Sequence, residues 1–89
     1  MEKISLRAGG HNSQSLLLEL LEMKAHIQGT AGLMEVSVYS HALLDGDFLI
    51  SLLWDMDEPY HNGSPAGLSL VQALNKFGLI NHSTWIKKD

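Results

Sequence analysis

The sequence predicts an α+β fold in which two helices cover one face of a four-stranded antiparallel sheet. Three observations predict it: a leucine-rich helical pattern, two β-type runs joined at Asp45-Gly46, and a second helical pattern followed by a closing β run. With a short alternating run at residues 3–8, these patterns give the order β-α-β-β-α-β, a split βαβ arrangement. The opposite face of such a sheet then needs a cover.

The first part of the chain shows a strand pattern followed by a helix pattern. Residues 3–8 alternate apolar and polar side chains, which is the period of a half-buried strand. Side-chain oxygens that suit the start of a helix follow on Asn12, Ser13 and Ser15. One apolar stripe of the helix is formed by Leu16, Leu20, Met23 and Ile27. We expect the helix to pack on the sheet and to end near Gly29 or Gly32.

A β-hairpin is predicted in the middle of the chain. Residues 33–41 and 47–55 are rich in Val, Leu, Ile, Tyr and Trp, and Asp45-Gly46 suits a two-residue type I′ turn. If the loop consists of these two residues, Tyr39 faces Leu52 across the hairpin. A loop longer by one residue would shift this register.

The predicted register gives the hairpin two different faces. One face mixes large apolar side chains with hydrogen-bonding ones, namely Ser37, Tyr39, His41, Ile50, Leu52 and Trp54. The other face suits packed helices and carries Val36, Val38, Leu49 and Leu53 with Ser40 and Ser51. The mixed face is too apolar to be left in water, so we expect a second subunit, a ligand or both to cover it.

A second helix and a last strand complete the predicted fold. Ser64-Pro65 supplies an N-cap followed by proline at the first helical position, where its missing N–H has no cost. The apolar stripe of this helix is formed by Leu70, Val71, Leu74 and Phe77. Gly78 suits the end of the helix, and residues 79–86 return to β character. The sequence does not decide which face of this last strand points inward. One face carries Ile80, His82, Thr84 and Ile86, and the other carries Asn81, Ser83 and Trp85.

Length and composition indicate one small globular domain over residues 1–89. A chain of this size buries only roughly 60–65% of its unfolded surface, which makes an oligomer plausible. Six Lys and Arg residues against ten Asp and Glu residues give a net charge of −4. The largest basic cluster is Lys87-Lys88, so we expect no nucleic-acid partner.

The sequence also indicates a cellular setting. It has no cysteine, which excludes disulfides and thiolate sites and fits a reducing compartment. The first residues lack the apolar block of a signal peptide, and no stretch approaches the roughly 18 apolar residues of a membrane span. We therefore expect a cytoplasmic protein without a membrane partner.

The mixed face is the predicted ligand pocket. Its expected lining residues are Arg7, Glu35, Ser37, Tyr39 and Trp54, with a small apolar or aromatic molecule as the ligand. Arg7 and Glu35 are the charges expected to project into it, either as ligand contacts or as a buried ion pair. A plain dimer interface without a cavity is the alternative, because Trp and Tyr are common interface anchors.

The five histidines do not show the spacing of a metal site, since neither His-x-x-x-His nor His-Glu-x-x-His occurs. Four residues of one loop carry groups that bind divalent cations: Asp55, Asp57, Glu58 and His61. A solvated acidic loop explains them better, so we expect no metal. His41 and His82 are the candidate catalytic bases, against the alternative of hydrogen-bonded sheet histidines.

Two segments resemble the antibiotic biosynthesis monooxygenase-like group of the dimeric α+β barrel superfamily. They are the run Gly32-Leu33-Met34-Glu35-Val36 and the strand 48–54 that closes on Trp54. The resemblance implies a ferredoxin-like fold, a homodimer with its sheets face to face, and a small-molecule cavity in each subunit. Some members of the group oxidise aromatic polyketides or quinols without metal or flavin, and others degrade haem.

The chain departs from that family in two places. Residues 65–77 contain neither the tryptophan nor the histidine of the haem-degrading pattern, which disfavours haem degradation. The polar loop 55–63 and the short helix after it differ from the usual longer acidic and aromatic helix. Only Trp54 carries over by position, either as a pocket residue or as a structural one.

The hypothesis that follows is a small-molecule-binding homodimer, a cofactor-independent monooxygenase acting on a phenolic or quinol-like compound. Trp54 and Tyr39 would hold the ring, and His41 or His82 would accept the phenolic proton so that the electron-rich anion meets oxygen. The alternatives are a non-catalytic binding or assembly module and a regulatory domain that binds a metabolite at the dimer interface.

Overall fold

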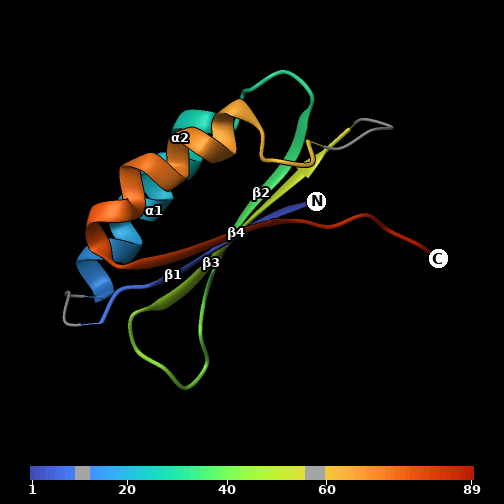
Figure 1. The fold of residues 1–89 in the computed structure, drawn as a ribbon. Coiled ribbons are helices and arrows are strands. Elements are labelled where there is room, and N and C mark those ends of the chain that lie inside the picture. Colours follow the sequence, from blue (N-terminus) through green and yellow to red (C-terminus); the bar gives the residue numbers. More distant parts are fainter. Residues whose placement is uncertain (10–12, 56–59) are drawn as a thin grey trace.

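The computed structural model describes residues 1–9, 13–55 and 60–89. Its elements are β1 (Glu2–Arg7), α1 (Ser13–Ile27), β2 (Leu33–Ser40), β3 (Asp47–Trp54), α2 (Pro65–Leu74), the short 3₁₀ helix η1 (Asn75–Phe77) and β4 (Leu79–Thr84). The four strands form one antiparallel sheet in the order β2-β3-β1-β4. Both helices lie on the same side of this sheet (Figure 1). The predicted ferredoxin-like α+β fold is confirmed.

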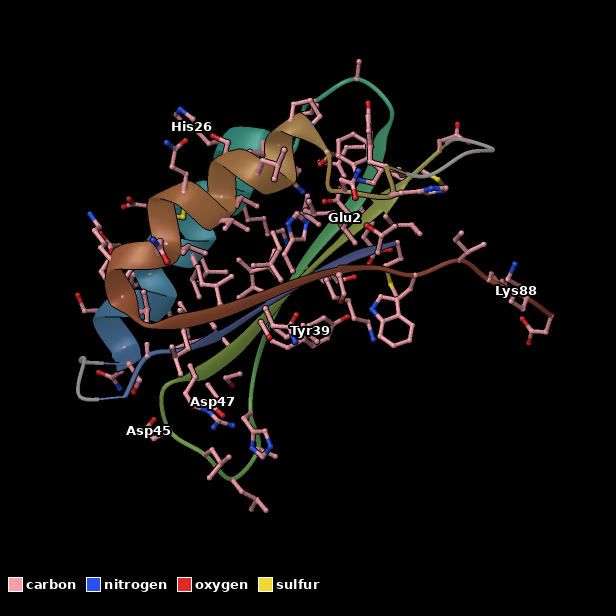
Figure 2. All side chains as sticks on the ribbon, viewed as in Figure 1. Glu2, His26, Tyr39, Asp45, Asp47 and Lys88 are labelled. Carbon is pink, nitrogen blue, oxygen red and sulfur yellow. The ribbon has the colours of Figure 1, made fainter. Side chains whose placement is uncertain are left out.

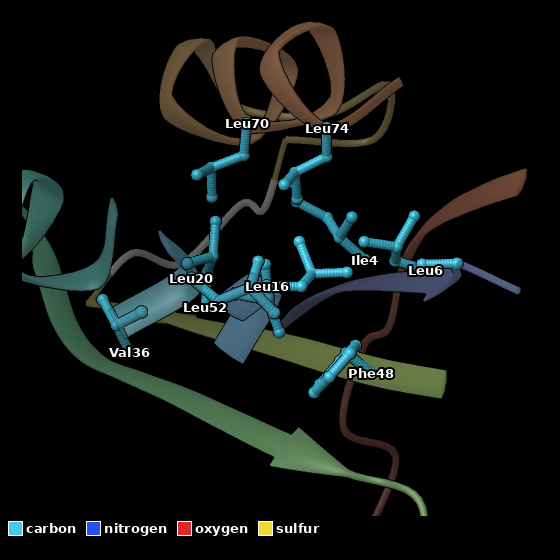
Figure 3. Close-up of a cluster of buried hydrophobic side chains, with 11 residues drawn as sticks. Ile4, Leu6, Leu16, Leu20, Val36, Phe48, Leu52, Leu70 and Leu74 are labelled. Carbon is cyan, nitrogen blue, oxygen red and sulfur yellow. The ribbon is translucent and has the colours of Figure 1, made fainter. Parts of the chain in front are cut away.

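The core lies between the two helices and one face of the sheet (Figure 3). Its buried side chains are Ile4, Leu6, Ala8, Leu16, Leu20, Val36, Phe48, Ile50, Leu52, Leu70 and Leu74. Every second residue of β1 takes part because alternate side chains of a strand point to the same face. No helix among the described residues is long and apolar enough to cross a membrane.

The helix ends follow from local hydrogen bonds. Ser64 caps α2 as predicted, since its side chain accepts a hydrogen bond of 2.9 Å from the backbone N–H of Gly67. The end of α1 lies close to Gly29, as predicted, but it is not made by a left-handed glycine cap. The helix stops at Ile27, whose carbonyl accepts hydrogen bonds from both the backbone N–H and the hydroxyl of Thr30. A threonine, and not Gly29 or Gly32, therefore terminates the helix.

The predicted register of the hairpin is wrong. Tyr39 pairs with Leu49 and not with Leu52, and the N–H of His41 donates to the carbonyl of Asp47 at 2.8 Å. The loop is therefore residues 42–46 and not Asp45-Gly46 alone. The observed register differs from the predicted one by an odd number of residues. Because side chains alternate along a strand, the residues of β2 keep their predicted faces and those of β3 lie on the opposite faces.

The reversal has a physical cause in the central strand of the sheet. β3 pairs with β1, where Leu6 lies opposite Phe48 and Ile4 lies opposite Ile50. Partners across an antiparallel pair share a face, so this pairing directs the alternate residues of β3, including Leu52 and Trp54, toward the helices. Leu49, Ser51 and Leu53 then point to the outer face. The free energy gained by burying Phe48, Ile50 and Leu52 outweighs the preference of Asp45-Gly46 for a two-residue turn.

The inward face of β4, left open by the sequence, is the one that carries His82. This residue pairs with Ile4, and Ile80 pairs with Leu6. Both partners belong to the buried core. Trp85, which follows the strand, is exposed.

The register predicts a clear difference between neighbouring leucines of β3. Leu52 is 0% exposed and Leu53 is 37% exposed. Leu52→Ala should lower the free energy of unfolding by about 2–5 kcal/mol, because it leaves a cavity among packed core residues. Leu53→Ala should cost about 1 kcal/mol or less. Chemical denaturation of both variants checks this, and the opposite order would contradict the observed pairing.

Candidate functional site

A cluster of polar and aromatic side chains lies on the helix side of the sheet, at the end where β1 begins. We call it the Glu2 cluster, and it consists of Glu2, Trp54, Ser64 and His82. These residues come from β1, from the end of β3, from the N-cap of α2 and from β4. Glu2 is only 1% exposed, although it is charged. It follows the same alternation as Ile4 and Leu6, which is why it points into the protein.

The carboxylate of Glu2, which is labelled in Figure 2, accepts a hydrogen bond from each of the other three residues. Trp54 Nε1–H donates to Oε1 at 2.7 Å, and the backbone N–H of Ser64 donates to Oε2 at 3.0 Å. His82 Nε2 lies 2.7 Å from Oε2. Burial alone raises the pKa of this carboxyl, but the hydrogen bonds from Ser64, His82 and Trp54 hold the pKa below its ordinary value of 4.5. Glu2 is therefore an ionised acceptor.

This contact sets the tautomer of His82. An ionised carboxylate can only accept hydrogen bonds, so Nε2 carries a proton and, in the neutral ring, Nδ1 does not. The side chain is 15% exposed. His82 therefore presents an imidazole nitrogen that can accept a proton, with a carboxylate behind the ring to stabilise the resulting charge. That arrangement is the one used by histidine bases in catalytic sites.

Two glycines make room for the pair. A Cβ at Gly67 would collide with Oε2 of Glu2, and a Cβ at Gly63 would collide with the ring of His82. Gly63 also has a φ of +97°, which disfavours other residues. The loop before α2 and the first turn of α2 can approach the carboxylate and the imidazole because these positions lack side chains.

An aromatic pair borders the Glu2 cluster. The rings of Trp54 and Tyr60 are 5.6 Å apart at an interplanar angle of 74°, an edge-to-face contact. The hydroxyl of Thr84, on the inward face of β4, donates to the carbonyl of Tyr60 at 2.8 Å. This bond ties the segment that carries Tyr60 to the strand that carries His82. Aromatic surface and a proton acceptor are thus brought to the same end of the sheet.

The second predicted base, His41, is held differently. Its Nδ1 accepts the backbone N–H groups of Leu43 and Leu44, each at 3.0 Å. The neutral ring therefore carries its proton on Nε2 and offers a hydrogen-bond donor instead of an acceptor. Nδ1 of His82 accepts no hydrogen bond from any of the described residues, whereas Nδ1 of His41 accepts two.

Of the five predicted pocket residues, all but Trp54 lie on the outer face of the sheet. Arg7, Tyr39 and His41 line an open hollow of about 530 Å³ on the outer side of the sheet. Glu35 and Ser37 lie beside each other on β2, where the hydroxyl of Ser37 donates to Oε1 of Glu35 at 3.2 Å. Trp54 and His82 belong to the helix side instead. The prediction that Trp54 and Tyr39 share a face is wrong because β3 has the other register.

The possible cation loop falls partly outside the described residues. Asp57 and Glu58 belong to residues 56–59, which the structure does not describe. Among the residues that it does describe, no group of three or more His, Asp or Glu side chains is placed to hold a metal ion.

Sequence reasoning missed Glu2 and Tyr60. A signal for Glu2 was present, since it falls in phase with the apolar residues of its strand. Tyr60 gave no such signal, because a single tyrosine in a polar loop has no periodicity from which its partner can be inferred.

Two solved structures are similar to this chain over nearly its whole length. One is a variant of SnoaB, a cofactor-independent oxygenase from Streptomyces nogalater, with a TM-score of 0.76, 11% identity, and coverage of 99% of this chain and 91% of that one. The other is a putative antibiotic biosynthesis monooxygenase from Deinococcus radiodurans, with a TM-score of 0.67, 18% identity, and coverage of 99% and 93%. No protein-family model and no curated protein matches the sequence.

The chain has the fold of the antibiotic biosynthesis monooxygenase-like proteins. This likeness confirms the fold that the resemblance implied. At identities of 11% and 18% it establishes the monooxygenase-like fold, whereas the activity has to be argued from the site itself.

The ionised state of Glu2 predicts a pH-dependent stability. Because its pKa is lowered in the folded state, its contribution is present above pH 4.5 and is lost as the pH falls through the folded pKa. Glu2→Gln should lower the unfolding free energy near neutral pH by roughly 1–3 kcal/mol, since the new amide places a donor among donors. The deficit should shrink well below pH 4.5. Urea unfolding of the wild type and Glu2→Gln, near neutral pH and again at acidic pH, measures this difference in unfolding free energy. A difference that does not change with pH would contradict an ionised Glu2.

Proposed function

We propose that this chain is a homodimeric, small-molecule-binding domain that acts as a cofactor-independent monooxygenase on a phenolic or quinol-like compound. The single observation that carries the proposal is the contact between His82 and Glu2. No group among the described residues is hydrogen-bonded to Nδ1 of this oriented imidazole, which can therefore take a proton beside the aromatic pair of Trp54 and Tyr60. The fold shared with a cofactor-independent oxygenase supports this proposal.

The proposed chemistry begins with a proton transfer. The phenolic hydroxyl gives its proton to Nδ1 of His82, and the carboxylate of Glu2 stabilises the imidazolium that forms. The phenolate is electron-rich and donates electrons to O₂. In the overall reaction a ring C–H and the O–H are lost, one oxygen atom becomes a new carbonyl and the other leaves as water, so the phenol becomes a quinone. All four electrons come from the substrate, which is why no redox cofactor is required.

A homodimer is part of the proposal because both helices lie on the other side of the sheet and several apolar side chains are exposed on its outer face. Tyr39, Leu53, Leu79 and Trp85 are exposed there, and Leu79 is 76% exposed. A second copy of the chain that packs its sheet against this face would bury these side chains.

One observation favours the non-catalytic alternative. Every buried side-chain nitrogen and oxygen among the described residues has a hydrogen-bond partner. A cluster whose members satisfy one another is also what a purely structural network requires. Under this alternative Glu2 and His82 hold the strands together in a binding or assembly module, and removal of His82 affects stability alone.

Oxygen consumption with a panel of quinols, naphthols and related phenols tests the catalytic role. His82→Ala should lower the rate by roughly 10²- to 10⁴-fold, the usual contribution of a general base. His26→Ala is the matched control, because this histidine is exposed on α1. Equal rates in the two variants, or no oxygen uptake with any compound, would refute the proposal.

The dimer predicts a position-dependent effect of added charge. Leu53→Lys places an ammonium group on the outer face and should convert dimers to monomers in sedimentation velocity runs, because a charge in an apolar interface loses its hydration. Leu18→Lys is the control, since Leu18 is exposed on α1. A wild-type chain that sediments as a monomer, or a Leu53→Lys variant that stays dimeric, would argue against this interface.

A further inference from the structure

The strand register determines which side chains lie next to one another in the hollow on the outer face. His41 is hydrogen-bonded to the backbone of Asp47, Asp47 pairs with Arg7, and Arg7 pairs with Leu79. These four residues therefore form one row across the sheet. All four line the same hollow of about 530 Å³. A hollow of this size suits a small organic ligand.

The polar part of the row alternates donor, acceptor and donor. His41 carries its proton on Nε2, because Nδ1 is used by the loop. Asp47 follows with a carboxylate, and Arg7 follows with a guanidinium group whose Nε lies 3.5 Å from Oδ2 of Asp47. The Arg7 side chain is 70% exposed, so its terminal nitrogens are open to a ligand.

The charges in the row select against ionic ligands. Arg7 and Asp47 cancel each other, and the neutral His41 ring adds no charge. A carboxylate placed over the row would be attracted by Arg7 but repelled by Asp47, and an ammonium group the reverse, so neither charge gains a net attraction. A hydroxyl group fits better, because it has one proton to donate to Asp47 and two lone pairs to accept from His41 and Arg7.

The next row supplies an apolar surface. Tyr39 pairs with Leu49, and Leu49 pairs with Ser5, so these side chains lie two residues further along the same face. The ring of Tyr39 and the side chain of Leu49 offer a surface on which a flat aromatic ring can rest. A ligand that spans both rows therefore needs an aromatic body and a hydroxyl group at one end.

We propose that this hollow is a binding site for an uncharged, hydroxylated aromatic compound, held through its hydroxyl group by His41, Asp47 and Arg7. The site is separate from the one that contains His82, because the two lie on opposite faces of the sheet. It does not depend on the oxygenase activity proposed above. The ligand would lie on the face that a second copy of the chain covers.

The probe for this site is 2-naphthol, with naphthalene and 2-naphthoate as analogues that lack the hydroxyl or replace it with a charge. Binding to the full chain is measured by isothermal titration calorimetry. The wild type should bind 2-naphthol roughly tenfold or more tightly than either analogue, because the analogues leave the polar row unpaired or face Asp47. Equal affinity for all three compounds, or no binding of 2-naphthol, would overturn the proposal.

Two substitutions test the polar row without disturbing the loop. His41→Asn retains an acceptor for the N–H groups of Leu43 and Leu44 but removes the donor on Nε2. Arg7→Met retains the apolar stem and removes the guanidinium. Each should weaken 2-naphthol binding by roughly threefold to tenfold, the effect of losing one hydrogen bond. The exposed control His26→Asn should have the wild-type affinity.

His82→Ala distinguishes this site from the proposed catalytic one. Binding of 2-naphthol at the hollow should persist in His82→Ala, whatever that variant does to oxygen consumption. If the affinity instead falls in His82→Ala and stays unchanged in His41→Asn and Arg7→Met, the compound binds on the helix side. That outcome would overturn the hollow as its binding site while leaving the proposed function intact.

Discussion

The buried carboxylate of Glu2 is the interaction on which the organisation of this end of the molecule depends. Removing an ionised carboxylate from water costs several kcal/mol unless its oxygens are fully hydrogen-bonded. Here the donors come from the indole of Trp54, the backbone of Ser64 and the ring of His82. The end of β3, the N-cap of α2 and the edge strand β4 are distant in sequence, and all three must therefore meet at Glu2 on β1. Their hydrogen bonds to this carboxylate fix the position of the start of α2 on the sheet.

The need of Glu2 for hydrogen-bond donors also fixes the orientation and the tautomer of His82. A histidine that faces a core as a lone side chain has no defined tautomer, whereas the carboxylate of Glu2 places the proton of His82 on Nε2. The orientation of the ring, its free nitrogen and the absence of side chains at Gly63 and Gly67 follow from one contact. The structural role of this cluster and the catalytic role proposed for it share the same atoms, which is why a measured reaction rate and a measured stability are both needed to separate them.

The two faces of the sheet differ in chemical character. The helix side is packed, and every buried side-chain nitrogen and oxygen among the described residues has a hydrogen-bond partner. The outer side combines exposed apolar side chains with a net-neutral row of His41, Asp47 and Arg7 at one end. Such a surface is suited to being covered, by a second copy over most of its area and by a small neutral molecule in the hollow.

Local sequence signals by themselves determined the order of the elements, the start of α2 at Ser64-Pro65 and the apolar stripe of α1, because capping and periodicity act within a few residues. They named His82 and Trp54 as functional candidates but placed Trp54 with Tyr39. Only the tertiary structure decided the hairpin register, the inward face of β4 and the meeting of Glu2 with His82. Alternation along a strand shows which side chains share a face, but the pairing with β1 selects which face is buried.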